Sequence, residues 1–163
     1  MNRMDRQLGT LLLVEDYEDV RTVLRLLLQC DHYRVLEAAT GIKALNILKT
    51  ESPDLIIMDL GLPELDGFET MRRIRKNEAF QDTPIIVLTA YTGPFHYQAA
   101  LRAGGDYIMG KPVDFEELEE LIHNILEGSI TTQRGSLLAT SDATPPLHGH
   151  SPSQVFKQRR VNH

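Results

Sequence analysis

The chain has 163 residues, 42% of them hydrophobic and 25% charged, with a formal net charge of −6 and one cysteine. This mix is typical of one soluble globular domain, and a lone cysteine excludes an internal disulfide framework or a cysteine-built zinc site. Residues 1–128 carry 13 Lys and Arg against 22 Asp and Glu, an acidic balance that disfavours nucleic acid binding by this part.

Short apolar runs alternate with helical patterns along the first 128 residues. The first run, residues 11–14, is too short for a signal peptide or a membrane span, so we expect a cytoplasmic protein without a membrane span. Apolar residues then recur between 20 and 28 with the 3.6-residue period of a helix. Further apolar runs predict four more strands, at 35–36, 55–58, 85–88 and 107–109.

Helical patterns also follow each of the later strands. Weaker stripes after Gly41 and after Asp66-Gly67 predict two helices, and we interpret Asp66-Gly67 as a turn that opens the second. Residues 95–103 are the least clear segment. The last stripe follows Asp114, and Glu117 three residues later forms a capping-box pattern typical of a helix start.

The predicted strands are apolar throughout, which indicates burial on both faces, and helices separate them, which indicates parallel pairing. We therefore predict an α/β, doubly wound (βα)5 domain over residues 10–128, after an N-terminal extension at 1–9. The flavodoxin-like strand order 2-1-3-4-5 is the candidate order for its five-stranded parallel sheet. Residues 129–163 are rich in Ser, Thr, Pro and Gly, and we predict a disordered tail with no output domain.

Polar side chains follow the predicted strands at the edge where a doubly wound sheet gathers its functional groups. Glu15 and Asp16 follow the first strand, Asp59 the third, Thr89 the fourth and Lys111 the fifth. In the order 2-1-3-4-5 the first and third strands are neighbours, so three carboxylates meet in a small volume. A hard cation that takes oxygen ligands relieves their repulsion, and Mg²⁺ also shares phosphate oxygens.

This set of groups suits phosphoryl transfer. Asp59 would be the carboxylate nucleophile, Lys111 and Mg²⁺ would neutralise the phosphoryl oxygens, and Thr89 would donate a hydrogen bond to one of them. Gly61 would let the backbone offer a carbonyl oxygen to the metal. Each acid by itself is weak evidence, because most such residues are solvated or cap a helix, as Asp16 could.

In these residues the sequence resembles the receiver domain of two-component response regulators. The matching segments are "LLLVEDYEDVR" (11–21), "DLIIMDLGLPELDG" (54–67), "PIIVLTA" (84–90), "AGGDY" (103–107) and "KP" (111–112).

The resemblance implies that Glu15 and Asp16 position Mg²⁺ and that Asp59 accepts a phosphoryl group from a phosphohistidine. It also implies that Thr89, Ala90 and Lys111 form the phosphate-binding and switch set, and it makes Lys111–Pro112 a candidate cis peptide bond.

One position departs from the family pattern. The family usually has an aromatic switch residue three positions before the lysine, and here that position is Ile108, with Tyr107 one step earlier. A shift of one residue turns a strand side chain to the other face. We therefore hypothesise a weakened or altered switch, with Tyr107 and Ile108 as the two candidates.

Two functions of a receiver domain fit this sequence. The first is a phosphoacceptor signalling protein that receives phosphate from a histidine kinase or histidine phosphotransfer protein and acts on a target through its fourth helix, fifth strand and fifth helix. It would be a monomer or a phosphorylation-dependent dimer, and no enzyme beyond self-catalysed phosphorylation and slow autodephosphorylation. The alternative is a constitutive receiver-fold interaction module whose phosphorylation is not the switch.

Two enzyme classes fit the sequence poorly. Haloacid dehalogenase phosphatases carry a second aspartate two residues after the first, and that position here is Gly61. A nucleotide-binding enzyme would need a glycine-rich phosphate loop after the first strand, where this chain has "EDYED".

Overall fold

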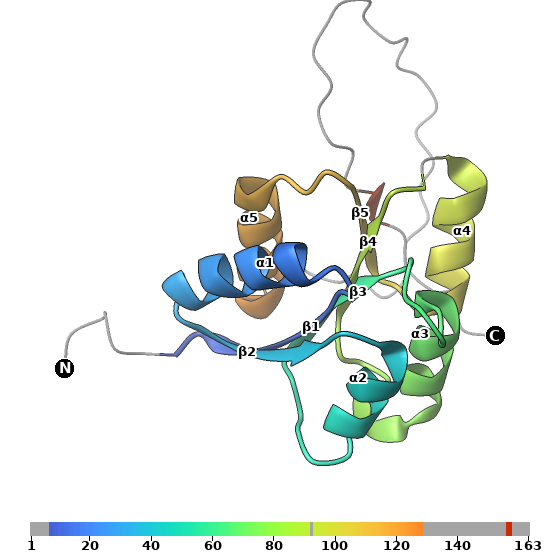
Figure 1. Cartoon of the computed structure of the whole chain (residues 1–163), viewed down its shortest axis with the longest axis horizontal. Helices are drawn as coiled ribbons and strands as arrows, with labels where there is room; N and C mark the ends of the chain where they lie inside the picture. Colours follow the sequence, from blue (N-terminus) through green and yellow to red (C-terminus); the bar gives the residue numbers. More distant parts are fainter. Residues whose placement is uncertain (1–6, 92, 129–155, 158–163) are drawn as a thin grey trace, which may run out of the picture.

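A computed structural model of the chain describes residues 7–91, 93–128 and 156–157 (Figure 1). Its strands are β1 (Gly9–Val14), β2 (Tyr33–Ala38), β3 (Leu55–Asp59), β4 (Ile85–Thr89), β5 (Tyr107–Gly110) and β6 (Phe156–Lys157). Its α-helices are α1 (Glu18–Cys30), α2 (Gly41–Ile47), α3 (Gly67–Lys76), α4 (Pro94–Ala103) and α5 (Phe115–Leu126), and a 3₁₀ turn, η2, covers Glu78–Phe80.

The sheet has the order β2-β1-β3-β4-β5-β6. The pairs among β1 to β5 are all parallel, which confirms the predicted doubly wound fold with five parallel strands in the order 2-1-3-4-5. Every residue of β3 and of β4 is buried, as expected for strands covered on both faces. The antiparallel β6 was not predicted, and it adds a sixth strand beside β5.

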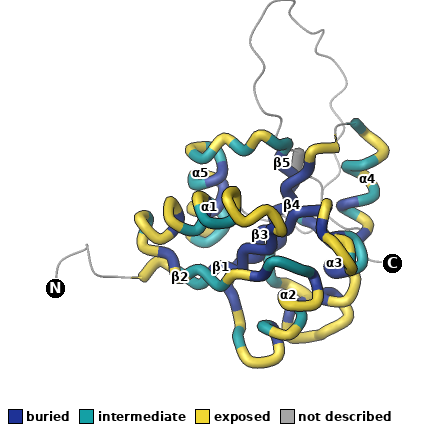
Figure 2. The backbone as a smooth tube through the Cα atoms, in the orientation of Figure 1, coloured by how far each residue is buried: buried dark blue, intermediate teal, exposed yellow. Residues whose placement is uncertain are grey.

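Alternate residues of strands β1 to β5 enter two separate cores. Leu12 and Val14 of β1 pack in one cluster, with residues of α2, α3 and α4, whereas Leu11 and Leu13 pack in the other, with residues of α1 and α5. Figure 1 shows the same division, with α1 and α5 on one face of the sheet. The dark strands in Figure 2 lie between these two helical layers.

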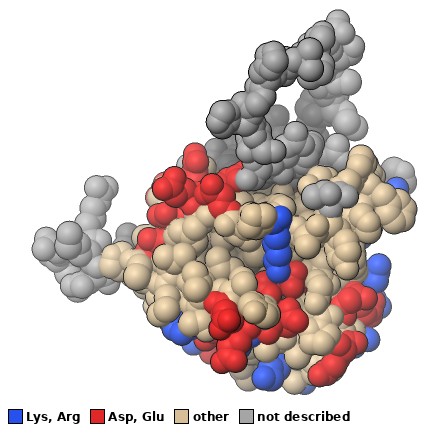
Figure 3. Space-filling model, turned by 45° about the horizontal axis from the view of Figure 1, so that its top comes forward, with Lys and Arg blue, Asp and Glu red and all other residues tan. Residues whose placement is uncertain are grey.

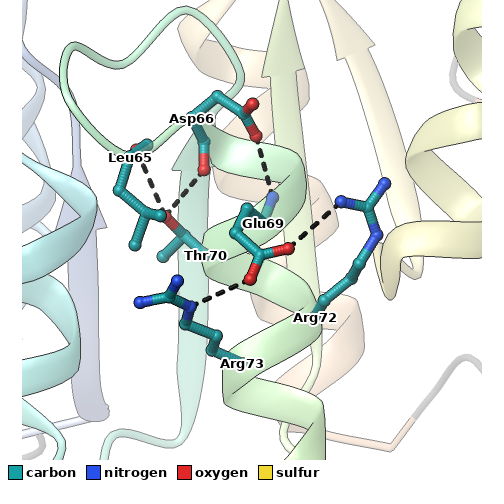
Figure 4. Close-up of polar contacts among 6 residues, drawn as sticks. All are labelled: Leu65, Asp66, Glu69, Thr70, Arg72 and Arg73. Atoms are coloured by element: carbon teal, nitrogen blue, oxygen red, sulfur yellow. Dashed lines mark hydrogen bonds and ion pairs between the residues drawn. The ribbon is translucent and has the colours of Figure 1, made fainter.

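The helix starts follow local hydrogen-bond chemistry. Asp66 accepts a hydrogen bond from the Glu69 amide at 2.8 Å, and the Thr70 hydroxyl donates to the Asp66 carbonyl at 2.8 Å (Figure 4). Asp114 likewise accepts from the Glu117 amide at 3.1 Å, as the capping pattern predicts. Asp16 is not the cap of α1, because the residue at that position is Tyr17.

The helix at the least clear segment, α4, begins with Pro94, whose fixed φ suits the first turn. On α1 only Leu24 and Leu28 of the apolar stripe are buried, whereas Val20, Val23 and Leu27 stay partly exposed. Within the described ranges, every helix falls short of the length and apolar character that a membrane span requires.

The described residues include only part of the predicted N-terminal extension and of the predicted tail. Strand β1 starts at Gly9, the last residue of the predicted N-terminal extension 1–9. The predicted disordered tail, 129–163, lies outside the described residues except at 156–157, where the chain forms β6.

Candidate functional site

Three carboxylates meet at the carboxyl ends of β1 and β3. Glu15 and Asp16 follow β1 directly, and Asp59 is the last residue of β3. Each offers an oxygen atom, and these atoms lie within 4.8 Å of one another. Glu15 and Asp59 are only 1% and 5% exposed, whereas Asp16 is exposed. Because β1 pairs with β3, the fold brings together the three acids that the sequence singled out.

Lys111 joins this acidic cluster from the end of β5. Its Nζ lies 2.8 Å from Glu15 Oε2 and 3.2 Å from Asp59 Oδ1. The contact spans 96 positions of sequence and two strands of the sheet. One ammonium therefore neutralises part of the charge of two buried carboxylates.

Burial and the neighbouring charged groups together shift the pKa values of Glu15 and Lys111. Burial raises the pKa of Glu15, and the nearby Asp59 charge adds to the increase, while the hydrogen bond from Lys111 opposes it. Burial by itself would lower the pKa of Lys111, but its hydrogen bond to Glu15 and the charges of Asp59 and Glu15 raise that pKa above its ordinary value. Lys111 is therefore held as a cation facing the acids.

The comparisons with known proteins agree with this geometry. Residues 11–123 match the family model described as the response regulator receiver domain. The chain belongs to the receiver family of two-component response regulators. Members of this family are signalling modules rather than metabolic enzymes, and the receiver domains of response regulators interact with histidine kinases.

Two curated relatives illustrate the likeness in sequence. The receiver chain is 41% identical over 137 residues to the KDP operon transcriptional regulatory protein KdpE of Escherichia coli, a match covering 83% of this chain and 60% of that protein. It is 38% identical over 135 residues to the transcriptional regulatory protein AfsQ1 of Streptomyces coelicolor, covering 83% of this chain and 56% of that protein. The matched part thus spans under two thirds of each regulator.

Solved structures of receiver domains show the same fold. The chemotaxis response regulator CheY4 of Vibrio cholerae superposes with a TM-score of 0.69 at 30% identity, covering 72% of this chain and 98% of that one. The receiver domain of the sensor histidine kinase PA1611 of Pseudomonas aeruginosa gives 0.68 at 34% identity, covering 73% and 98%, and was solved with a magnesium ion in its active-site cleft.

The donor set of this receiver domain fits a divalent hard cation. It offers three carboxylate oxygens, from Glu15, Asp16 and Asp59, in one cluster at a sheet edge. Oxygen ligands of this kind suit Mg²⁺, which keeps open positions for water and phosphate oxygens. Gly61, whose carbonyl oxygen we predicted as a ligand of the metal, lies in the loop that follows Asp59.

Two glycines, Gly61 and Gly67, lie close to Asp59. The Gly61 amide donates a hydrogen bond to Asp59 Oδ1 at 3.2 Å. Gly67, at the start of α3, packs so closely beneath the site that a Cβ there would collide with the backbone carbonyl oxygen of Asp59. The sequence assigned Gly67 only to a turn and helix start, whereas the structure also makes it a contact of Asp59.

The remaining predicted phosphate-binding residues lie at the ends of β4 and β5. Thr89 is buried and pairs with Gly110, and its carbonyl accepts a hydrogen bond from the Lys111 amide at 2.8 Å. The Thr89 hydroxyl accepts a hydrogen bond from the Tyr91 amide at 2.9 Å. Ala90, directly after β4, is exposed, and the Lys111–Pro112 bond is cis.

Tyr107 and Ile108 enter opposite cores of the receiver domain. Tyr107 packs in the cluster that α1 and α5 cover, and Ile108 packs in the cluster that contains Ala100 and Ala103 of α4. Both side chains are buried. The aromatic ring therefore lies on the face of the sheet away from α4.

Sequence reasoning missed Arg21 as a support of the acidic loop. Its Nη1 donates to the carbonyl oxygens of Glu15 at 2.9 Å and of Asp16 at 3.3 Å. A basic residue so close to the start of a helix opposes the usual macrodipole preference. The position of Arg21 in the first turns of α1 is therefore a weak sequence signal, and it does not identify the carbonyl groups that Arg21 binds.

Proposed function

We propose that Asp59 is the phosphoacceptor of a two-component phosphorelay and that its phosphoryl donor is the phosphohistidine of a histidine kinase or of a histidine phosphotransfer protein. The observation that carries this proposal is the contact of Lys111 Nζ with Asp59 Oδ1 inside a cluster of three carboxylates. Family membership supports the same assignment.

The chemistry follows from the residues around Asp59. A carboxylate oxygen of Asp59 forms the new bond to phosphorus, and the bond between phosphorus and the donor imidazole nitrogen breaks, with its electron pair staying on the nitrogen. Lys111 holds a positive charge where the phosphoryl oxygens gain negative charge. Mg²⁺ bound by Glu15, Asp16 and Asp59 would supply further charge neutralisation. The Gly61 amide keeps the Asp59 carboxylate oriented.

The strand β5 and its flanking helices form the proposed output side. Thr89 and Lys111, the two groups expected at the phosphate, are linked through the Thr89 carbonyl. Lys111 directly follows β5, and β5 lies between α4 and α5 in Figure 1. A change at the phosphate would therefore reach a target on this side. The protein would work in the cytoplasm, as a monomer or as a dimer formed on phosphorylation.

A constitutive binding module is the second candidate. Its support is the placement of Tyr107, which lies in the core that faces away from α4, while Ile108 occupies the core on the α4 side. Such a domain would bind its partner equally well with and without phosphate on Asp59.

Intact mass spectrometry tests the acceptor assignment. The native chain, Asp59→Asn and the control Asp19→Asn, an exposed acid of α1, are incubated with acetyl phosphate with and without Mg²⁺. We expect one added phosphoryl group on the native chain and the control, and none on Asp59→Asn or without Mg²⁺. Labelling of Asp59→Asn at the native level would contradict the assignment.

A further inference from the structure

The outer edge of β5 is occupied by a segment from the end of the chain. Tyr107 pairs with Lys157 and Ile108 pairs with Phe156, in antiparallel register. Figure 1 shows this short dark red strand, β6, beside β5. The five-stranded order would otherwise leave β5 as an edge strand. An edge of this kind presents unpaired backbone groups that can accept one more strand.

Backbone geometry identifies the amide that β6 would cover. The Asp106 amide donates to the Ile85 carbonyl, on the inner side toward β4. Successive amides of a strand point to opposite sides, so the Tyr107 amide points to the outer edge. That is the side on which Lys157 pairs with Tyr107.

Charge favours attraction between the two parts of the chain. Residues 1–128 carry 13 basic and 22 acidic side chains, whereas residues 129–163 carry four basic and one acidic. Three of those four, Lys157, Arg159 and Arg160, lie at or directly after β6 in sequence. The helix α5, which flanks β5, begins with the acidic sequence "FEELEE". Figure 3 shows acidic side chains gathered in groups over one face of the domain.

We propose that the outer edge of β5 is a docking edge for an extended peptide strand and that its occupant is the C-terminal segment of the same chain around Phe156–Lys157. This segment adds to the sheet by β-augmentation, in which backbone hydrogen bonds give affinity. A partner strand that uses this edge has to displace it first. That competition rests on the proposed output role of β5, whereas the pairing itself does not.

Amide hydrogen exchange of Tyr107 tests the proposal in the full chain without phosphate. Lys157→Pro removes a backbone donor from β6, and Ser136→Pro places the same change outside the two paired residues. We expect the Tyr107 amide to exchange about tenfold faster in Lys157→Pro than in the native chain or in Ser136→Pro. A synthetic peptide of residues 150–163 added to Lys157→Pro should restore the slow exchange.

Equal Tyr107 exchange in the native chain and in Lys157→Pro would overturn the proposal. Protection that rises with protein concentration would also overturn it, because the strand would then come from a second copy. Phosphorylation of Asp59 is measured separately by mass on the same preparations. Failure at the β5 edge therefore leaves the acceptor assignment untouched, and failure of labelling leaves the edge pairing untouched.

Discussion

At the scale of single residues, the site depends on one cation shared by two buried acids. Glu15 is almost fully buried, and its carboxylate receives hydrogen bonds from Lys111 Nζ at 2.8 Å and from the Tyr17 amide at 3.2 Å. A buried carboxylate without such partners would keep its charge only at a high free-energy cost. Lys111 therefore stabilises the resting site as well as serving the proposed chemistry.

Lys111→Met should destabilise the metal-free protein by about 1–3 kcal/mol near neutral pH, because Glu15 loses its counter-charge. The pKa of Glu15 is already raised by burial, and without Lys111 it should rise further. An ionised Glu15 then destabilises the folded state. The loss of unfolding free energy in Lys111→Met should therefore be small below the pKa that Glu15 has in the unfolded chain, and it should grow as the pH rises through the pKa that Glu15 has in the folded protein. Urea unfolding at pH 5 and pH 7.5 measures this change.

Lys43→Met, at an exposed position of α2, is the matched control and should leave the unfolding free energy nearly unchanged. Glu15→Gln combined with Lys111→Met should recover part of the loss, because the uncompensated charge is gone. A deficit for Lys111→Met that stayed constant with pH would contradict the role assigned to Glu15.

At the scale of elements, the carboxyl end of β3 and the start of α3 have to fit against each other. The Gly67 amide donates to the Leu60 carbonyl at 3.2 Å, and the Asp66 side chain caps α3. The close approach leaves no room for a Cβ at Gly67 beside the Asp59 backbone. The position of Asp59, the proposed acceptor, thus depends on how α3 begins.

Gly67→Ala should lower the free energy of unfolding by about 1–3 kcal/mol, since an added methyl group forces the backbone around Asp59 to move. It should also slow labelling of Asp59 by acetyl phosphate. Gly110→Ala is the control, because a Cβ there meets no atom within 4 Å. Comparable loss in both variants, measured by urea unfolding, would show that the contact with Asp59 is not the cause.

The two candidate switch residues of β5 can be separated in the same way. Because Tyr107 faces the α1 and α5 core, a response of α4 to phosphate should not depend on its ring. We expect phosphorylation to change the amide exchange of α4 at least as much in Tyr107→Ala as in the native chain. A change of normal size that Tyr107→Ala abolishes and Ile108→Ala preserves would refute the hypothesis of an altered switch.

At the scale of the whole molecule, topology assembles the site. Residues 96 positions apart, Glu15 and Lys111, make direct contact because parallel strands end at the same edge. The acidic balance of residues 1–128 adds to the repulsion among the clustered carboxylates. A bound divalent cation and the ammonium of Lys111 are the groups that would offset this repulsion.

The sequence by itself predicted the doubly wound fold of five parallel strands and the candidate residues of the site. Uninterrupted apolar runs, the helical stripe after residue 20 and the Asp114 cap are local signals, so they predict elements without tertiary information. The order of carboxylates, threonine and lysine at strand ends then identified Glu15, Asp16, Asp59, Thr89 and Lys111.

Only the tertiary structure decided how those residues meet. The contact of Lys111 with Glu15 joins residues 96 positions apart, which no local pattern encodes. The steric demand at Gly67 and the hydrogen bonds from Arg21 join residues closer in sequence, but they depend on how the loops after β3 and β1 fold. The same holds for β6, because strand pairing is a long-range contact and two residues carry no periodicity of their own.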